Sequence, residues 1–167
     1  APDGVISTIA GNGTYGYSPD GTDALSAKIG IIPYLDVDVN GNIYLSDSTY
    51  NVVRKIGTDG KIVTVAGKPS ENYRGTGDGG LATQAVLDGL YDCVVTKNGT
   101  LFISTKGVIR RVSPDGIISS VAGTHGVQGN SGDGAAASDA LLFRPSGMAL
   151  DSSEDLYITD EKMHNVR

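Results

Sequence analysis

The chain has 167 residues, a mass of 17.2 kDa and a formal net charge of −6, with a sequence pI of about 4.7. This acidic balance argues against nucleic acid as a partner, because nucleic-acid binding depends on Lys and Arg neutralising phosphates. No apolar run approaches the roughly 18 residues that cross a bilayer, and no polybasic patch occurs, so no membrane role is expected. The 24 Gly, about twice the usual share, indicate frequent turns.

A repeat dominates the sequence. The phrase GVISTIAG at residues 4–11 returns as GKIVTVAG at 60–67 and as GIISSVAG at 116–123, with a spacing of 56 each time. Two further phrases follow the same rhythm: NIYLSD, TLFIST and DLYITD at 42–47, 100–105 and 155–160, and NVVR, GVIR and NVR at 51–54, 107–110 and 165–167. Self-similarity at one period indicates a repeat architecture.

Each phrase has the character of a strand, because it is short, rich in β-branched and aromatic residues and bounded by turn residues. Asn40-Gly41 and Asn98-Gly99 stand where two-residue hairpins favour positive φ. The unit is therefore predicted to be four antiparallel strands. The predicted strands cover 34–39, 42–47, 51–56 and 61–66, then 91–96, 100–105, 108–112 and 117–122, and finally 146–151, 155–160 and 164–167.

The connectors between units also repeat. Asp20, Asp78 and Asp133 are each followed by Gly, with Ala four and seven residues later and an aliphatic residue nine residues later. The pattern predicts a surface turn and a short packed stretch before the next strand. The Asp side chains are candidates for an acidic binding set, although Asp at a turn also bonds its own backbone N–H groups.

Four-stranded repeats of this length predict an all-β fold, a β-propeller of four-stranded antiparallel blades with three blades in the chain. We expect a single repeat domain over 1–167. In it, residues 1–11 supply a fourth strand that completes a blade, 12–67 and 68–123 form the first and second blades with their connectors, and 124–167 form a third blade without its fourth strand.

The motifs GNIYLSD with Arg54-Lys55-Ile56, and DLYITD with His164-Asn165-Val166-Arg167, resemble the NHL-repeat family, as do the Ala-Gly strand ends and the Gly-Asp-Gly connectors. The resemblance covers essentially the whole chain and implies a binding scaffold. The copies depart from the family pattern in two places. Tyr50 stands where Asn is usual, and Thr105 replaces an Asp, so the middle blade is expected to lack a strand-end hydrogen bond.

Three blades are too few for one closed propeller, so we expect two chains to form one six-bladed homodimeric ring. Each chain would lend its first strand to the other's third blade, because residues 1–4 mirror 113–116 and Arg167 mirrors Arg110. The alternative is an excerpt of a longer propeller, or a dissected or engineered repeat that only self-assembles. The predicted assembly seam consists of Val5, Ile6, Ile9, Val166 and Arg167.

Several motifs imitate cofactor or metal sites. Residues 11–16 fit G-x-G-x-x-G, but a dinucleotide site needs a helix to follow, and a connector follows instead. Residues 36–47 imitate a calcium loop, yet they span a predicted hairpin that sends alternate residues to opposite faces. His125 and His164 are the only histidines, which falls short of a zinc site. No cofactor and no resident metal are therefore expected, although a metal shared on the ring axis stays open.

Catalytic signals are equally sparse. Cys93 lies in a predicted inner strand and is expected to be a core residue, and no Gly-x-Ser-x-Gly motif occurs. The leading prediction is therefore a non-enzymatic propeller that binds a protein, peptide or glycan through its loops or central funnel. Propeller enzymes of the amidating-lyase or strictosidine-synthase-like type are the alternative.

Residues on loops held by a rigid scaffold commonly bind ligands, although Tyr also packs between blades. The candidate ligand-binding residues are Tyr15, Tyr17, Asp20, Tyr73, Asp78, His125 and Asp133. The sequons at Asn12 and Asn98 fall at predicted turns and favour secretion, although Asn-Gly is also common at turns.

Overall fold

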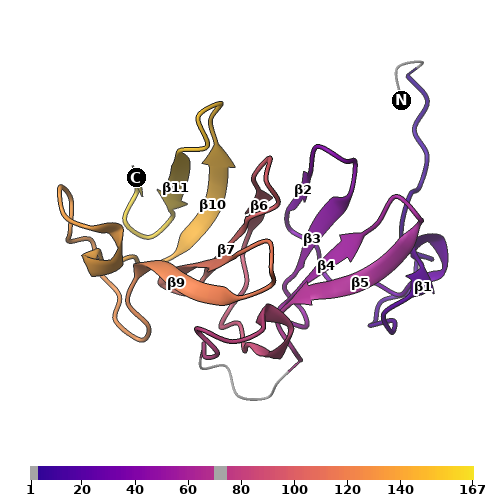
Figure 1. Cartoon of the computed structure of the whole chain (residues 1–167), viewed down its shortest axis with the longest axis horizontal. Coiled ribbons are helices and arrows are strands. Elements are labelled where there is room, and N and C mark those ends of the chain that lie inside the picture. The colour runs from indigo at the N-terminus through magenta and orange to yellow at the C-terminus, as the bar shows by residue number, and fades with distance from the viewer. Residues whose placement is uncertain (1–3, 70–74) are drawn as a thin grey trace.

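The computed structural model describes residues 4–69 and 75–167. It contains three antiparallel sheets that follow one another along the chain (Figure 1). The first sheet comprises β1 (Thr22–Asp23), β2 (Leu35–Val37), β3 (Ile43–Asp47), β4 (Val52–Ile56) and β5 (Lys61–Ala66), in the order β1-β5-β4-β3-β2. The second comprises β6 (Cys93–Val95), β7 (Leu101–Thr105), β8 (Val108–Val112) and β9 (Ile118–Gly123), and the third β10 (Pro145–Leu150), β11 (Leu156–Asp160) and β12 (Asn165–Val166).

These strands confirm the antiparallel repeat predicted from the sequence. Within each sheet every strand pairs with the next along the chain, except that the short β1 joins the outer edge of the first sheet. β1 was not predicted, because two residues carry no strand pattern. Within the described ranges, no helix is long and apolar enough to cross a membrane.

Hydrophobic side chains fill the space between neighbouring sheets. Between the first and second sheets, Tyr44 and Val53 pack in one cluster with Cys93 and Ile103. Between the second and third sheets, Ile109, Ala122, Leu142 and Ile158 form another cluster, with Phe102 and Met148 against it. Because side chains alternate across a strand, a sheet with a neighbour on each side, as the second sheet has, must present apolar residues on both faces. This requirement explains the near-continuous apolar phrases of the repeat.

The innermost strands of the sheets are joined by carboxylates. Asp36 accepts a hydrogen bond from the backbone N–H of Val95 at 2.8 Å, and Asp92 accepts one from Met148 at 2.7 Å. Each bond links the inner strand of one sheet to the inner strand of the next. Burial raises the pKa of Asp92 although its bonds from Met148 and Cys93 act in the opposite direction. These inter-sheet bonds were not predicted from the sequence.

The Asn-Gly hairpins differ in detail from the prediction. Gly41 has φ +84° and Gly99 has φ +85°, whereas the preceding Asn residues are not in the left-handed region. Gly41 donates its N–H to the carbonyl of Asp38, and Asp38 also accepts side-chain bonds from the N–H groups of Asn40 and Asn42. The loop is therefore a turn that ends in a left-handed glycine, not a two-residue hairpin.

Each connector contains one turn of 3-10 helix, namely η1 (Ala24–Ser26), η2 (Ala82–Gln84) and η3 (Ala137–Asp139). The predicted short packed stretch is thereby confirmed. Ala24 and Ala82 are buried, because alanine is small enough to let the connector lie against the sheet. Ala137, at the same position of the third connector, is exposed.

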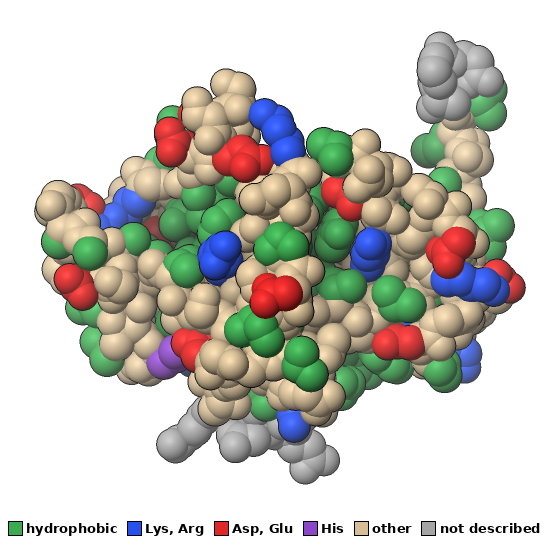
Figure 2. Space-filling view, in the orientation of Figure 1, with side chains coloured by type: hydrophobic (Ala, Val, Ile, Leu, Met, Phe, Trp, Pro, Cys, Tyr) green, Lys and Arg blue, Asp and Glu red, His purple; other side chains and the backbone are tan. Residues whose placement is uncertain are grey.

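The first described residues, from Gly4, and the C-terminus lie at opposite ends of the row of sheets (Figure 1). Residues 5–10, predicted as a fourth strand, form no strand within this chain. They belong to an arm, residues 4–10, that projects from the first sheet with Ile6 and Ile9 exposed, while Ala10 at its base packs against the core of that sheet (Figure 2). The second sheet has four strands, whereas the third has three among the described residues.

Candidate binding site

The three connector aspartates form ion pairs with arginines of the sheets. Asp20 pairs with Arg54 of β4 at 3.3 Å, and Asp133 pairs with Arg167, which follows β12, at 2.6 Å. Asp78 pairs in the same way with Arg110 of β8. We call each pair an Arg–Asp clasp. Each clasp ties a connector to the third strand of the sheet that follows it in the sequence.

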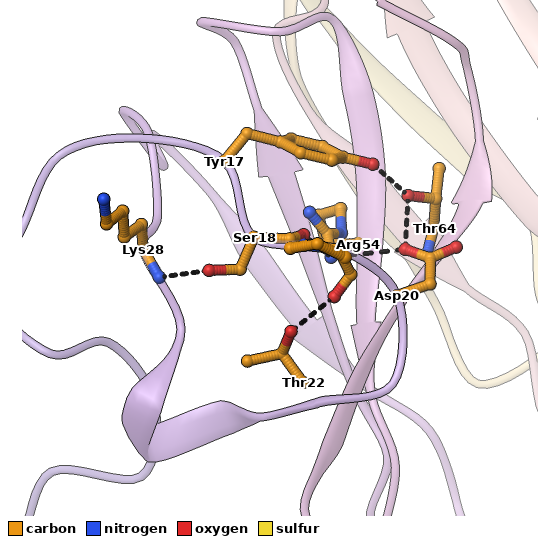
Figure 3. Close-up of polar contacts among 8 residues, drawn as sticks. Tyr17, Ser18, Asp20, Thr22, Lys28, Arg54 and Thr64 are labelled. Carbon is orange, nitrogen blue, oxygen red and sulfur yellow. Dashed lines mark hydrogen bonds and ion pairs between the residues drawn. The ribbon is translucent and has the colours of Figure 1, made fainter.

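The first clasp is elaborated by aromatic and hydroxyl groups (Figure 3). The buried Arg54 guanidinium lies 4.4 Å from the centre of the Tyr17 ring and donates to the carbonyl of Ser18 at 3.0 Å. The Tyr17 hydroxyl lies 2.8 Å from Oγ1 of Thr64. Asp20 accepts both the N–H of Thr64 at 2.9 Å and its hydroxyl at 3.0 Å. The carboxylate therefore holds the outer strand β5 as well as the arginine.

The second clasp adds a histidine. Asp78 accepts the N–H of Ser120 in β9 at 3.0 Å, and the Ser120 hydroxyl lies 2.9 Å from Nε2 of His125. Burial raises the pKa of Asp78, but the hydrogen bonds from Ser120 and the charge of Arg110 outweigh burial and hold it below its usual range. Burial and the nearby Arg110 lower the pKa of His125.

The predicted ligand-binding residues are thus distributed over separate places. Tyr17, Asp20, Asp78, His125 and Asp133 lie in or beside the three clasps, where they hold connectors to sheets. Tyr15 is exposed and forms an isolated bridge with Ile29. Tyr73 lies outside the described residues. No structural contact gathers these residues into one pocket within the described part of the chain, and their ligand-binding role stays a prediction.

A different set of residues surrounds a cavity of about 470 Å³ at one end of the innermost strands. We call this cavity the mouth. Its walls come from all three sheets, from the segments that enter β2, β6 and β10 and from the turns after β3 and β11. Its main side chains are Tyr34, Ser48, Tyr91, Arg144, Ser146 and Glu161.

Arg144 organises the mouth. Its guanidinium lies 5.3 Å from the centre of the Tyr91 ring, and its Nε lies 3.2 Å from Oε2 of Glu161. A second contact joins Nη1 to Oε1 of Glu161 at 3.3 Å, and the N–H of Glu161 donates to the carbonyl of Arg144. Both charged side chains remain partly exposed, so the pair presents donors and acceptors to the solvent.

Sequence reasoning missed the mouth because its residues do not recur from copy to copy. Register places Pro33, Tyr91 and Ser146 at corresponding points of the three inner strands, so the repeat gives no common signal there. The one available signal is an aromatic residue one or two positions before each inner strand, namely Tyr34, Tyr91 and Phe143.

The motifs that imitate metal and nucleotide sites have structural roles. Asp47 accepts backbone N–H groups from Gly30, Thr49 and Tyr50, and Asp38 serves its own turn. Within the described residues, no group of three His, Cys, Asp or Glu side chains could hold a metal ion. No helix follows Gly16, because the chain continues into β1 and the single turn η1.

The departure at Thr105 has the consequence expected from the sequence. In the first sheet the Asp47 carboxylate accepts N–H groups of the turn that follows β3. In the third sheet Asp160 accepts the N–H of Met163 in the turn after β11, and also that of Arg144 before β10. Thr105 instead donates its hydroxyl to the carbonyl of Val108. A hydroxyl offers two acceptor sites where a carboxylate offers about four, and the Thr105 hydroxyl acts here as a donor to Val108, so it does not take over the role of Asp47 and Asp160.

Comparison with known proteins identifies the fold. No protein-family model and no curated protein sequence matches the chain. A protein of unknown function from Bacteroides thetaiotaomicron is similar to it, with a TM-score of 0.71 and 24% identity over 80% of this chain and 34% of that one. Virginiamycin B lyase from Staphylococcus aureus gives a TM-score of 0.50 and 15% identity over 81% and 40%.

An auxiliary nutrient binding protein from Bacteroides ovatus gives a TM-score of 0.51 and 14% identity over 90% of this chain and 54% of that one. The chain therefore spans about a third to about half of the length of these structures. They are β-propeller-like proteins, and the chain is an all-β, propeller-like assembly of antiparallel sheets. At these identities the likeness establishes the fold alone.

Proposed function

We propose that the chain is a non-enzymatic binding module of the NHL propeller type whose mouth binds a short peptide segment. The observation that carries the proposal is the convergence of Tyr34, Tyr91 and the Arg144–Glu161 pair from different sheets on one open cavity. Each of these residues lies at the end of a strand or beside it. Side chains held in this way are preorganised, which reduces the entropy lost on binding.

The composition of the mouth favours a peptide. Tyr and Arg are enriched where proteins bind other proteins, because they combine a large apolar area with polar groups. The Arg144–Glu161 pair can donate to a peptide carbonyl and accept from a peptide N–H. The cavity volume of about 470 Å³ lies within the usual range for ligand sites and accommodates a few residues.

The enzyme alternative has less support at this site. Among the described residues that line the mouth, Glu161 carries the single carboxylate and none is a histidine. The likeness to a lyase is one of fold. A binding role needs only the surface that is present, so we take it as the function that the geometry supports best.

Selection from a random peptide display library against the purified chain tests the proposal. We expect enriched peptides whose affinity falls about tenfold for Arg144→Ala and for Tyr91→Ala, equivalent to about 1.4 kcal/mol. Arg111→Ala is the matched control, because Arg111 is an exposed arginine of β8 outside the mouth. Equal binding by Arg144→Ala and Arg111→Ala would overturn the proposal, as would enrichment of glycans from an array with no peptide selected.

A further inference from the structure

Three isoleucines at one position of the repeat have opposite environments. Ile62 in β5 is 1% exposed and Ile118 in β9 is 0% exposed, and each belongs to a hydrophobic core cluster. Ile6 stands 56 residues before Ile62 in the same phrase and is 96% exposed. Ile6 therefore stands at a position that is buried in the other two copies of the repeat but is exposed to solvent in the arm.

Among the three Arg–Asp clasps, the third has no bond from an outer strand within the described residues. Asp20 and Asp78 each accept a backbone N–H from an outer strand, that of Thr64 or Ser120, in addition to the arginine. Asp133 contacts Arg167 among the described residues, and its side chain is 81% exposed, compared with 51% and 45% for the other two. Thr8 stands 56 residues before Thr64. A strand that carried Thr8 would complete the third clasp.

The backbone of the connectors gives the same result. Ala24 donates its N–H to the carbonyl of Gly60, and Ala82 donates to Gly116, both at 2.8 Å. These bonds bury Ala24 and Ala82 beneath the start of an outer strand. The corresponding Ala137 is exposed, and the glycine that corresponds to Gly60 is Gly4 of the arm. The exposed side chains and the unused backbone groups therefore agree: a strand with the sequence of residues 4–10, aligned as residues 60–66 are in the first sheet, would fit beside β12.

The arm already leaves its own connector in the required direction. Gly11 and Asn12 donate to the carbonyls of Ala24 and Ala27, just as Gly67 and Lys68 donate to Ala82 and Ala85. In the second case the residues before Gly67 form β5, the outer strand of the preceding sheet. The arm thus occupies the position of an outer strand from a sheet that would precede the first. The third sheet of the same chain lies at the opposite end of the row (Figure 1).

The outer faces of the first and third sheets carry the same kinds of residues as the two faces that pack together between the first and second sheets. Between the first and second sheets, Tyr44 and Val53 cover Cys93 and Val95, and all four are buried. On the outer face of the third sheet, Tyr157 and Val166 occupy the positions of Tyr44 and Val53 but are exposed.

On the outer face of the first sheet, Leu35 and Val37 occupy the positions of Cys93 and Val95, and they too are exposed. The third sheet of one chain can therefore pack on the first sheet of another as the first packs on the second. This contact would continue the sheet-to-sheet contact already present within the chain.

We propose that the occupant of the third sheet is the arm of a second copy of this chain. Residues 4–10 of that copy pair with β12 as its outer strand, with Ile6 against Ala137 and the N–H of Thr8 on the Asp133 carboxylate. Two copies that exchange arms in this way form one closed ring of six sheets. The proposal does not depend on the peptide-binding function of the mouth.

Light scattering coupled to size-exclusion chromatography tests the proposal on the 167-residue chain. We expect a species of twice the chain mass of 17.2 kDa. Thr8→Pro removes the N–H that Asp133 would accept and shifts the species to the monomer at micromolar concentration. Thr8→Ser is the matched control and keeps the dimer, because Ser120 occupies this position in β9. A monomeric wild type, or a dimer unaffected by Thr8→Pro, would overturn the proposal.

Cysteine pairing tests the register separately. Ala66 lies opposite Val53 and Ala122 opposite Ile109, so Ala10 is predicted to lie opposite Val166 of the second copy. Directly opposite residues bring their Cβ atoms to about 5 Å, which is close to disulfide geometry. Mixing Ala10→Cys and Val166→Cys chains under mild oxidation should give a disulfide-linked heterodimer. Absence of this product, with each variant folded by circular dichroism, contradicts the register.

Discussion

The second and third sheets are built from the same repeat but end differently. In the second sheet, β9 covers the clasp, Arg110 is fully buried, and Asp78 holds both the arginine and Ser120. In the third sheet the same clasp joins Asp133 to Arg167, the described residues supply no outer strand beside β12, and Asp133 remains exposed.

The difference indicates what an outer strand contributes. It lowers the exposed fraction of the aspartate side chain from 81% at Asp133 to 51% at Asp20 and 45% at Asp78, supplies a backbone donor to the carboxylate and buries the alanine of the connector. Removing an arginine that is itself buried is costly, because its packing is lost and its hydrogen-bond acceptors lose a partner, whereas an exposed ion pair contributes little. Equivalent substitutions in the two sheets should therefore have unequal effects.

The largest expected difference concerns the arginines. Arg110→Ala removes a fully buried side chain, leaves a cavity and takes the charge partner from the half-exposed Asp78, so the free energy of unfolding should fall by about 3 kcal/mol. Arg167→Ala in the monomer should cost less, about 1 kcal/mol, because Asp133 is exposed, although Arg167 also donates to the carbonyls of Leu141 and Ser131. Urea denaturation followed by circular dichroism measures both values. Equal losses would mean that the outer strand does not govern the energy of the clasp.

A smaller difference concerns the glycines that end the outer-strand phrases. Gly123 has φ +83°, and a Cβ there would lie 2.1 Å from the carbonyl oxygen of Gly107. At Gly11 the φ is +88°, but the nearest atom is a side-chain methyl of Ile29 at 3.4 Å. Gly123→Ala should therefore destabilise the chain by about 2 kcal/mol and Gly11→Ala by about 1 kcal/mol, because both pay for the left-handed backbone but only one clashes.

Thermal unfolding at a concentration at which the chain is monomeric measures these two variants. Gly126→Ala serves as the control, since Gly126 has φ +76° and open space around its Cβ position. If arms are exchanged, Gly11→Ala also weakens the dimer, because Gly11 then meets the second copy as Gly67 meets the carbonyl of Asn51. A loss at Gly123 no greater than that at Gly126 would contradict the close approach.

The smallest difference concerns acid stability. The pKa of Asp78 is lowered in the fold, so its ionised form stabilises the protein above the unfolded value of about 4, and this contribution is lost as pH falls through the folded pKa. Asp78→Asn should cost about 1 kcal/mol at pH 7, after allowance for partial exposure, and progressively less below pH 4. Asp133→Asn should change the stability of the monomer by less than about 0.5 kcal/mol. Unfolding curves from pH 3 to pH 7 test both; a cost at Asp78 that does not shrink in acid would refute the mechanism.

The strands were predictable because every copy repeats the same apolar phrase, and the packed connectors because their alanines recur. The contacts between sheets were not, because Asp36 and Asp92 bond to residues 59 and 56 positions away and occupy different points of the repeat. The role of the connector aspartates was only half anticipated. The sequence pattern predicts that each aspartate either caps its own turn or binds a ligand, yet the arginine that each one binds lies 32 to 34 residues further along.

The mouth illustrates a different limit. Its residues are individual to each copy, so periodicity cannot identify them, and only the bending of the chain into a row of sheets brings Tyr34 near Arg144. Repetition in the sequence thus reveals the scaffold, whereas the candidate site consists of the positions where repetition fails.

The reactivity of the sole cysteine can report how often the first and second sheets separate. Cys93 is fully buried in the innermost strand of the second sheet, and burial raises the pKa of its thiol, which keeps the sulfur protonated and inaccessible to reagents. An alkylating dye can therefore react only with molecules in which the first two sheets have separated. The rate of labelling reports the frequency of that separation, residue-specifically and without any engineered probe.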